Sequence, residues 1–318
     1  MADESPALVR TRLKSIFGGS VGNLIEWYDF YVYNAFALYF AKQFSPSDDP
    51  TVQYLNIFGI YAIAFFVRPV GSILLGTYAD TRGRKAALTL SVMLMCAGSL
   101  LIAVIPTYAT IGYWAPALLL LARIIQSLSL GGEYAASATY LSEIAVSKHR
   151  GFYSSFQYVT LIGGQVLAAF VLLVMQQRLT SAELEAWGWR VPFLIGAACA
   201  VYGLYLRRNL VETAAFQRVA QNERRNPLRE VFQHPRELLL VFGLTAGGTA
   251  AFYTFSTYMP TFLANTVKLP REQANLLSFI TLFCFAAFQP LLGGLSDRIG
   301  RKPVLLWFGI MGTLCTYL

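Results

Sequence analysis

The chain alternates long apolar runs with short polar connections. Most of these runs reach the roughly 20 residues that a helix needs to cross a bilayer. They are too long, and too rich in Gly and Ala, to be buried strands, so the pattern predicts membrane-spanning helices. The predicted spans are 16–41, 54–79, 86–106, 115–142, 152–177, 191–206, 238–263 and 273–295, and a ninth begins at residue 303 and reaches residue 318.

The composition supports this interpretation. Hydrophobic residues make up 56% of the chain and charged residues 13%, whereas an ordinary soluble domain carries about 25% charged residues. A disordered chain would need low hydrophobicity and high charge. The net charge of +8 could suggest nucleic acid, but the basic residues form short clusters between the apolar runs. We therefore expect a lipid bilayer as the surroundings and no nucleic-acid partner.

No pattern in the sequence indicates an enzyme or a metal site. The four cysteines, Cys96, Cys199, Cys284 and Cys315, lie inside apolar runs and lack metal-ligand spacing. The two histidines lie in polar connections. We expect no catalytic residues, no metal and no cofactor.

The distribution of Lys and Arg predicts the orientation in the membrane. Connections on the side of the N-terminus hold 18 of the 25 basic residues, those on the opposite side hold five, and two lie inside spans. Cytoplasmic loops carry the excess of Lys and Arg. The N-terminus is therefore expected to be cytoplasmic.

An internal repeat divides the chain into two halves. Residues 76–85 and 293–302 align without gaps at an offset of 217 residues and share Asp, Gly, Arg and Lys at equivalent positions. The longest polar stretch lies between them. The predicted domains are an N-terminal half of six spans (1–206), a cytoplasmic linker (207–237) and an incomplete C-terminal half (238–318). A doubled unit would give about 434 residues, so we expect the sequence to stop inside the ninth span.

These motifs carry a family resemblance. The pattern G-x-x-x-D-x-x-G-R-K after the second and eighth spans resembles the cytoplasmic signature of the major facilitator superfamily. Within it, residues 22–30, 68–71 and 131–133 resemble the metabolite:proton symporter family, and Glu143 with Arg150 resembles a motif shared with sugar porters. The resemblance implies an all-α integral membrane fold of two six-helix halves, twelve spans when complete, in the bacterial inner membrane.

The resemblance also implies a function. Residues 115–143, 151–167 and 252–259 are most similar to family members that carry 2-oxoglutarate. We therefore expect a monomeric secondary transporter that moves a small carboxylate, 2-oxoglutarate, together with a proton by alternating access. Other family substrates remain open, namely proline or betaine, shikimate and citrate. A non-transporting sensor on the same scaffold and an inactive fragment are further alternatives.

Five ionisable residues lie inside the predicted spans: Glu26, Asp29, Arg68, Arg123 and Glu133. Such groups cost roughly 2.5–3.5 kcal/mol each to insert and are functional candidates by default. At 1.5 Å per residue, Asp29 lies about 20 Å from the inner surface and Arg123 about 12 Å from the outer one, which is similar depth in a core about 30 Å thick. We expect Asp29, Glu26 and Arg123 to form the proton-coupling cluster, with Asp29 as the proton site. The alternative is a structural ion pair.

Arg68 and Arg123 are the only cations in the spans and are therefore the expected anchors for a substrate carboxylate. Arg68 could instead pair with Glu133, which lies at a similar depth. Neutral donors on the fifth and seventh spans would complete the site, although aromatic residues there could serve packing alone. The neutral donors assigned to substrate binding are Gln157, Tyr158, Tyr253 and Tyr258.

The two copies of the loop motif predict a gate. The orientation rule explains the Arg and Lys of both copies, but it does not explain Asp80 and Asp297, which occupy the same position in each copy. Its carboxylates can cap helix N-termini or pair with arginine and so hold the cytoplasmic side closed. The predicted gating residues are Asp80, Arg84, Glu143, Arg150, Asp297 and Arg301.

Overall fold

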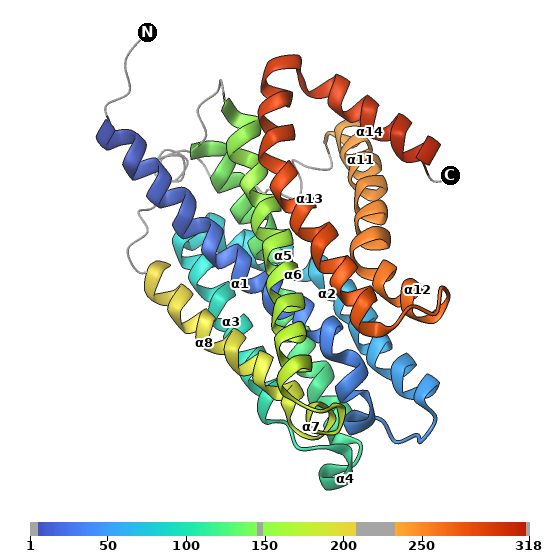
Figure 1. Cartoon of the computed structure of the whole chain (residues 1–318). Helices are drawn as coiled ribbons and strands as arrows, with labels where there is room; N and C mark the ends of the chain where they lie inside the picture. Colours follow the sequence, from blue (N-terminus) through green and yellow to red (C-terminus); the bar gives the residue numbers. More distant parts are fainter. Residues whose placement is uncertain (1–5, 145–148, 208–232, 316–318) are drawn as a thin grey trace. The chain divides into compact units, whose positions relative to one another are not determined.

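The structure, a computed structural model, describes residues 6–144, 149–207 and 233–315. These residues form helices, and no strand occurs among them (Figure 1). Within the described residues, each of the nine predicted spans coincides with one or more helices. The long helices are α1 (Pro6–Phe44), α2 (Pro50–Arg82), α3 (Arg84–Val104), α5 (Trp114–Ile144), α6 (Arg150–Arg178), α8 (Val191–Arg207), α11 (Pro235–Tyr253), α13 (Arg271–Ile299) and α14 (Arg301–Cys315).

Shorter elements join or interrupt these helices. The sequence pattern did not predict them, because segments of three to seven residues carry no periodic signal. The predicted seventh span is one such case: it consists of α11, a π-helical turn and a short α-helix. The short elements are α4 (Tyr108–Ile111), α7 (Ser181–Ala186), the 3₁₀ turn η2 (Gly188–Arg190), the π-helical turn η3 (Thr254–Tyr258) and α12 (Met259–Asn265).

The chain divides into two compact units. The first takes in α1 to α8 together with the chain from Phe283 onward, and the second takes in the chain between them up to Leu282. Most of the predicted linker, 207–237, lies outside the described residues. The predicted boundaries at 206 and 237 stay a prediction.

Local sequence signals explain where α2 begins and ends. Asp49 caps its N-terminus by accepting a hydrogen bond from the Thr51 N–H at 2.8 Å, and Pro50 occupies the first turn. The helix ends at Gly83, whose φ of 103° requires a glycine. Gly300, the equivalent residue of the second motif copy, has a φ of 92°. The repeated glycine therefore serves a helix end in both copies.

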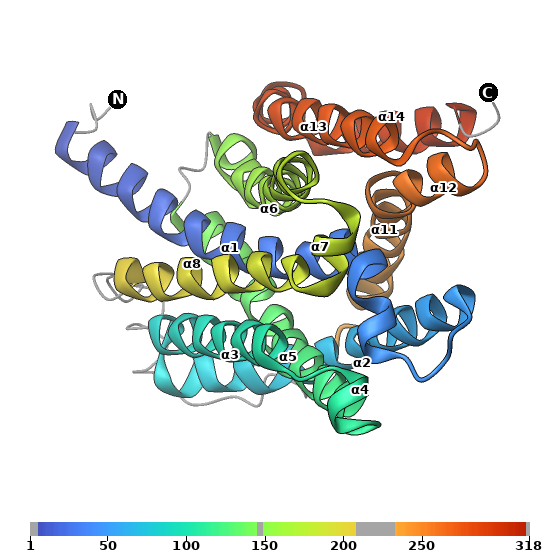
Figure 2. The same ribbon diagram turned by 60° about the horizontal axis from the view of Figure 1, so that its bottom comes forward.

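Helix α1 packs against α6 on one side and against α5 and α8 on the other (Figure 2). Glycine permits the closest approach to α6: a Cβ on Gly164 would lie 2.6 Å from the backbone nitrogen of Tyr28. Helices α2 and α5 approach in the same way, because a Cβ on Gly71 or Gly131 would collide with the partner backbone at Leu128 or Arg68. Small residues at such contacts are typical of helix packing in membranes.

Six helices in the described part of the chain are long and apolar enough to cross a membrane. The predicted spans 16–41, 191–206 and 303–318 are not among them. The helices α8 and α14 are described over 17 and 15 residues, and α1 carries Asn23, Glu26 and Asp29 near its middle. The six are Thr51–Ala79, Lys85–Val104, Trp114–Gly132, Arg150–Arg178, Pro235–Tyr258 and Gln273–Ile299.

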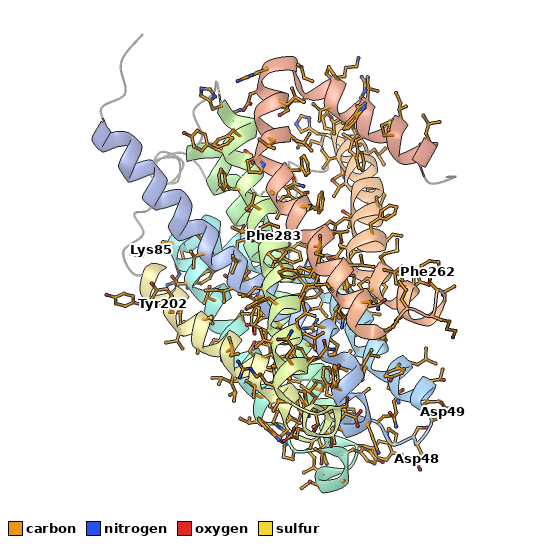
Figure 3. The ribbon with its side chains drawn as sticks, in the orientation of Figure 1. Asp48, Asp49, Lys85, Tyr202, Phe262 and Phe283 are labelled. Carbon is orange, nitrogen blue, oxygen red and sulfur yellow. The ribbon has the colours of Figure 1, made fainter. Side chains whose placement is uncertain are left out.

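Four labelled residues mark the two ends of the first unit. Lys85 lies at the start of α3, at the same end of the unit as Tyr202 of α8, while Asp48 and Asp49 lie at the opposite end (Figure 3). The end that carries Lys85 is also the end at which α1 begins (Figure 1).

Candidate functional site

Two arginine side chains of the first unit converge on one aromatic ring. The guanidinium carbon of Arg68 on α2 lies 4.3 Å from the ring centre of Phe30, and that of Arg123 on α5 lies 5.1 Å from it. The two guanidinium groups are therefore no more than roughly 10 Å apart, within cation–π range of a shared ring. Phe30 belongs to α1, so three helices build this arrangement.

Further aromatic rings surround the two cations. Arg68 also stacks on Phe65 at 3.8 Å, and Arg123 stacks on Tyr33 at 4.2 Å and on Tyr61 at 5.4 Å. Tyr33 is held in place because its hydroxyl donates to the carbonyl oxygen of Ile57 at 2.9 Å. These rings supply a low-dielectric lining with negative faces, which stabilises a guanidinium that has left water.

Arg123 is fully buried, and its hydrogen bonds are incomplete. Its Nη1 donates to Oε1 of Gln126 at 2.8 Å. Its Nε and Nη2 have no hydrogen-bond partner among the described residues. A buried donor without a partner is costly, so this half of the guanidinium fork is available to an anion.

Asp29 is also fully buried, and it points to a different neighbourhood. One carboxylate oxygen touches Gly196 on α8, and the Ser99 hydroxyl on α3 faces the carboxylate. Neither carboxylate oxygen accepts a hydrogen bond of ordinary geometry from a described residue, and no ion pair joins Asp29 to Arg123 in this part of the chain. Arg123 acts on Asp29 through its electric field. The direct pair remains a prediction.

Glu26 lies one turn below Asp29 on α1 and is equally buried. The hydroxyl of Ser129 on α5 lies 3.0 Å from its Oε1 and 2.6 Å from the carbonyl oxygen of Ser91 on α3. The two carboxylates are thus held by different helices and meet different partners.

Glu133 on α5 is the partner predicted for Arg68 on α2. The Arg68 carbonyl touches Gly131 on α5, two residues before Glu133, in agreement with the predicted level. The side chain of Glu133 lies outside the described part of the chain.

The neutral donors predicted for the substrate fall in three environments. Gln157 is buried and turned toward α1, with its Nε2 at 3.5 Å from Oδ1 of Asn23. Tyr158, the next residue, is 42% exposed. Tyr253 and Tyr258 belong to the second unit, where Tyr253 directly precedes the π-helical turn and Tyr258 is its last residue, 57% exposed. A π-helical turn frequently marks a functional site, but these two tyrosines are not placed relative to the arginines.

The gating residues meet only in part. Asp297 on α13 accepts hydrogen bonds from the backbone N–H groups of Gly151 and Phe152 at 2.8 and 2.9 Å, and so caps α6. Arg301 donates to Asp297 at 2.6 Å and also contacts Ser296. Arg150 is exposed at the start of α6. The side chains of Asp80, Arg84 and Glu143 lie outside the described part.

Several residues of the site were not assigned a role from the sequence. The sequence predicts no role for Asn23, Ser99, Gln126, Tyr61 or Phe65. Asn23 is visible at helical spacing, because it lies four residues before Trp27, whose Nε1 donates to it at 3.1 Å. A lone buried serine such as Ser99 gives no pattern signal.

Comparison with known proteins identifies the family to which the chain belongs. Residues 16–234 match the family described as "Sugar (and other) transporter". The chain belongs to this family. It is a multi-pass membrane transporter of the major facilitator fold and not an enzyme.

Relatives within the family are named for different substrates. The "Alpha-ketoglutarate permease" of Escherichia coli is 50% identical over 96% of this chain and 71% of its own length. A "Putative proline/betaine transporter" of Staphylococcus haemolyticus is 36% identical over 93% of this chain, and the "Proline/betaine transporter" of Salmonella typhimurium is 34% identical over 96%. The chain spans only 64% and 62% of the length of those two relatives.

Solved structures support the fold. The xylose transporter XylE from E. coli, in a partially occluded inward-open conformation, superposes with a TM-score of 0.68 at 19% identity, covering 92% of this chain and 72% of that one. XylE bound to 6-bromo-6-deoxy-D-glucose gives a TM-score of 0.69 at 19% identity, covering 92% and 70%.

Proposed function

We propose that the chain carries out proton-coupled symport of a small carboxylate, 2-oxoglutarate, by alternating access. The observation that carries this proposal is the convergence of Arg68 and Arg123 on the ring of Phe30. The 50% identity to the E. coli permease supports the choice of substrate.

The substrate chemistry fits two guanidinium groups. A dicarboxylate presents two planar anions, and arginine binds such groups through two parallel hydrogen bonds. The unused Nε and Nη2 of Arg123 form one such fork. Gln157, Tyr158, Tyr253 and Tyr258 remain the proposed neutral donors.

Asp29 is the proposed proton site, with Glu26 and Arg123 as its partners in coupling. A carboxylate buried at bilayer depth is stabilised in its neutral form unless a cation compensates it. Arg123 is the cation that acts on it here. When the substrate anion occupies Arg123, that compensation weakens and proton uptake by Asp29 becomes favourable.

The Asp297 cluster is the proposed cytoplasmic gate. Its carboxylate holds the first turn of α6 against α13 through two backbone donors, and Arg301 holds the carboxylate. Asp80, Arg84, Glu143 and Arg150 are proposed to act in the same way for the first motif copy.

We also propose a cytoplasmic N-terminus, an inner-membrane location and a monomeric state. The excess of Lys and Arg in the connections on the N-terminal side supports this orientation. The small carboxylate, the proton and the lipid bilayer are then the partners of the chain, and nucleic acid is not among them.

Uptake into liposomes tests the proposal. The purified chain is reconstituted and supplied with labelled 2-oxoglutarate, with and without an inward proton gradient, beside the E. coli alpha-ketoglutarate permease. We expect uptake that the gradient increases and that Arg68→Gln and Arg123→Gln abolish. Arg178→Gln, an exposed arginine at the end of α6, is the matched control and should retain uptake. A chain that neither binds nor takes up the label while the E. coli protein does would overturn the proposal.

A zwitterionic substrate is the second candidate, because several relatives are named proline/betaine transporters. Unlabelled proline and betaine are added in excess during the same assay. Competition by either, without competition by succinate or another dicarboxylate, would favour this alternative.

A further inference from the structure

We infer that Gln126 is a positioning residue for the substrate: held by Ser99, it orients the guanidinium of Arg123 so that one edge is left for a substrate carboxylate. This inference rests on the proposed function, in which Arg123 anchors a carboxylate. It assigns roles to two residues that belong to neither the proposed proton site nor the proposed substrate site.

Gln126 joins Arg123 to a neighbouring helix through two hydrogen bonds. Its Oε1 accepts from Nη1 of Arg123 at 2.8 Å, and its Nε2 donates to Oγ of Ser99 on α3 at 2.9 Å. Each of the three side chains is at most 1% exposed. A buried polar group that loses its partner is costly, so the two bonds together hold the amide in one place.

Only one orientation of the Gln126 amide satisfies both neighbours. Arginine has N–H donors and no acceptor, so the oxygen of the amide must face Arg123. The amide nitrogen then faces Ser99, whose hydroxyl oxygen accepts from it. Turning the amide over would bring two donors together at Arg123. Ser99 therefore ties Gln126 to α3 with its acceptor directed at the guanidinium.

Packing also restricts the stem of Gln126. A Cβ on Gly98, the residue before Ser99, would lie 2.5 Å from Cγ of Gln126 and 3.1 Å from the carbonyl oxygen of Ala122. The glycine lets the stem of Gln126 lie directly on α3. This close approach brings its amide within hydrogen-bond distance of Ser99.

Two contacts define how the guanidinium of Arg123 lies. Its central carbon lies over the ring of Tyr33 at 4.2 Å, which restricts the guanidinium plane, and the bond to Gln126 restricts rotation within that plane. Nη1 is used by Gln126, whereas Nε and Nη2 have no hydrogen-bond partner among the described residues. These two nitrogens donate in parallel from one edge, which matches the two oxygens of a carboxylate. Gln126 thus determines which edge remains for the substrate.

Loss of the Gln126 oxygen would remove the restriction on rotation. The guanidinium could then turn in its plane, and its two parallel donors would no longer be held in the direction of the carboxylate. Binding is weaker when the binding groups must be ordered by the ligand itself. The positive charge of Arg123 stays, so we expect the substrate to bind more weakly, through one hydrogen bond to Arg123 in place of two.

Infrared difference spectroscopy of bound 2-oxoglutarate tests the inference in the purified, reconstituted chain. The substrate carries an isotopic label at one carboxyl carbon or at the other, so that each carboxylate is observed separately. The separation between its antisymmetric and symmetric stretches differs between binding by two parallel hydrogen bonds and binding by one. The Kd for 2-oxoglutarate is measured on the same samples.

The variants are Arg123→Gln, Gln126→Leu, Ser99→Ala and Ser127→Ala. The last is the matched control, because Ser127 is 1% exposed beside Gln126 and its hydroxyl has no hydrogen-bond partner among the described residues. Ser99→Ala tests the inference even if Gln126→Leu cannot be reconstituted, since it releases the Gln126 amide and leaves the Gln126 side chain in place.

In the native chain, one carboxylate should show the pattern of two parallel bonds, and Arg123→Gln should remove this pattern or abolish binding. Gln126→Leu should change the same carboxylate to the single-bond pattern and raise the Kd roughly tenfold, the effect of one hydrogen bond to a charged group. Ser99→Ala should change it in the same direction and raise the Kd about threefold, because the lost bond is between neutral groups. The other carboxylate should keep its native pattern in both variants, and Ser127→Ala should match the native chain throughout.

Two results would overturn the inference, and they differ in what else they exclude. If Arg123→Gln has its expected effect but Gln126→Leu and Ser99→Ala keep the native pattern, the positioning role is wrong and Arg123 remains an anchor. If Arg123→Gln binds 2-oxoglutarate as the native chain does, or the native chain does not bind it, the proposed function fails as well. A purely structural role of Gln126 and Ser99 would lower the unfolding temperature and leave the pattern of the bound carboxylate unchanged, which would also contradict the inference.

Discussion

Helix α1 has two polar faces that differ in how completely their hydrogen bonds are made. Toward α6, Nδ2 of Asn23 donates to Thr160 at 2.7 Å and to the carbonyl oxygen of Gln157 at 3.2 Å, and Trp27 donates to its Oδ1. Every group of this face is neutral. Toward α3, α5 and α8, Asp29 and Arg123 are ionisable, and several of their buried polar atoms have no hydrogen-bond partner in the described chain.

The state of its hydrogen bonds suits each face of α1 to a different role. A neutral interface whose hydrogen bonds are made, as they are around Asn23, gains stability from one fixed arrangement. A buried charge with unused donors or acceptors costs stability, and it persists where a ligand or a proton completes it. We therefore assign helix packing to the α6 face and coupling to the face that contains Asp29. Variants that change one face at a time test this assignment.

The largest effect is expected for Asp29→Asn. The amide cannot exchange a proton, so gradient-driven accumulation of 2-oxoglutarate should fall by more than roughly tenfold. Exchange of internal for external substrate needs no net proton movement and should continue. Both rates are measured in the same liposome preparation. Accumulation at the native level would show that the charged face does not carry the coupling.

A matched pair of glycine variants separates the two faces. In Gly196→Ala the new methyl group meets the carboxylate of Asp29, which can rotate away, whereas in Gly164→Ala it lies 2.6 Å from the backbone nitrogen of Tyr28. We expect Gly164→Ala to lose about 1–3 kcal/mol of stability through overpacking. Gly196→Ala should unfold near the native temperature but accumulate several-fold less substrate. Thermal unfolding in detergent and uptake are measured for both, and the opposite assignment would contradict the comparison.

Asn23→Ala tests the neutral face directly. Removal of the amide deletes the hydrogen bonds that Asn23 makes with Thr160, Trp27 and the carbonyl oxygen of Gln157, at a cost of about 1–2 kcal/mol, judged from hydrogen bonds between membrane helices. The pH dependence of uptake should stay that of the native chain. Chemical unfolding and a pH profile provide the two measurements. A shifted pH profile would place Asn23 in the coupling network and remove the distinction between the faces.

The sequence predicted most of the fold because the signal is long and regular. Within the described residues, all nine predicted spans coincide with helices, and the motif glycines Gly83 and Gly300 end their helices with positive φ in both copies. The site was predicted as a set of charges, since Asp29, Arg68 and Arg123 are rare inside apolar runs. Their geometry was not predictable. Counting residues along a span predicts the depth of a side chain in the membrane. It does not predict the rotation of each helix about its own axis.

Because the sequence does not give the rotation of each helix about its axis, the predicted and the observed site differ in two places. Asp29 and Arg123 share a depth, yet Asp29 faces Gly196 and Ser99 while Arg123 stacks on aromatic rings. Gln157 has the donor expected of a substrate ligand, yet it is turned toward Asn23. Such choices depend on which helices become neighbours across more than 100 residues of sequence, and period-based patterns carry no information about that.

The smallest effect is expected in the connection between α6 and α8, away from both faces. Glu183 forms a capping box with Thr180 at the start of α7, and the hydrogen bonds from the Thr180 backbone and hydroxyl lower the pKa of Glu183. Since its pKa is lower in the folded chain, this contribution to stability is complete above the unfolded pKa. It is lost as the pH falls through the folded pKa. Glu183→Gln should therefore lower the unfolding temperature slightly at neutral pH and leave it unchanged in acid. Because Glu183 is exposed, uptake and its pH profile should match the native chain, and a change in either would extend the coupling network beyond the charged face of α1.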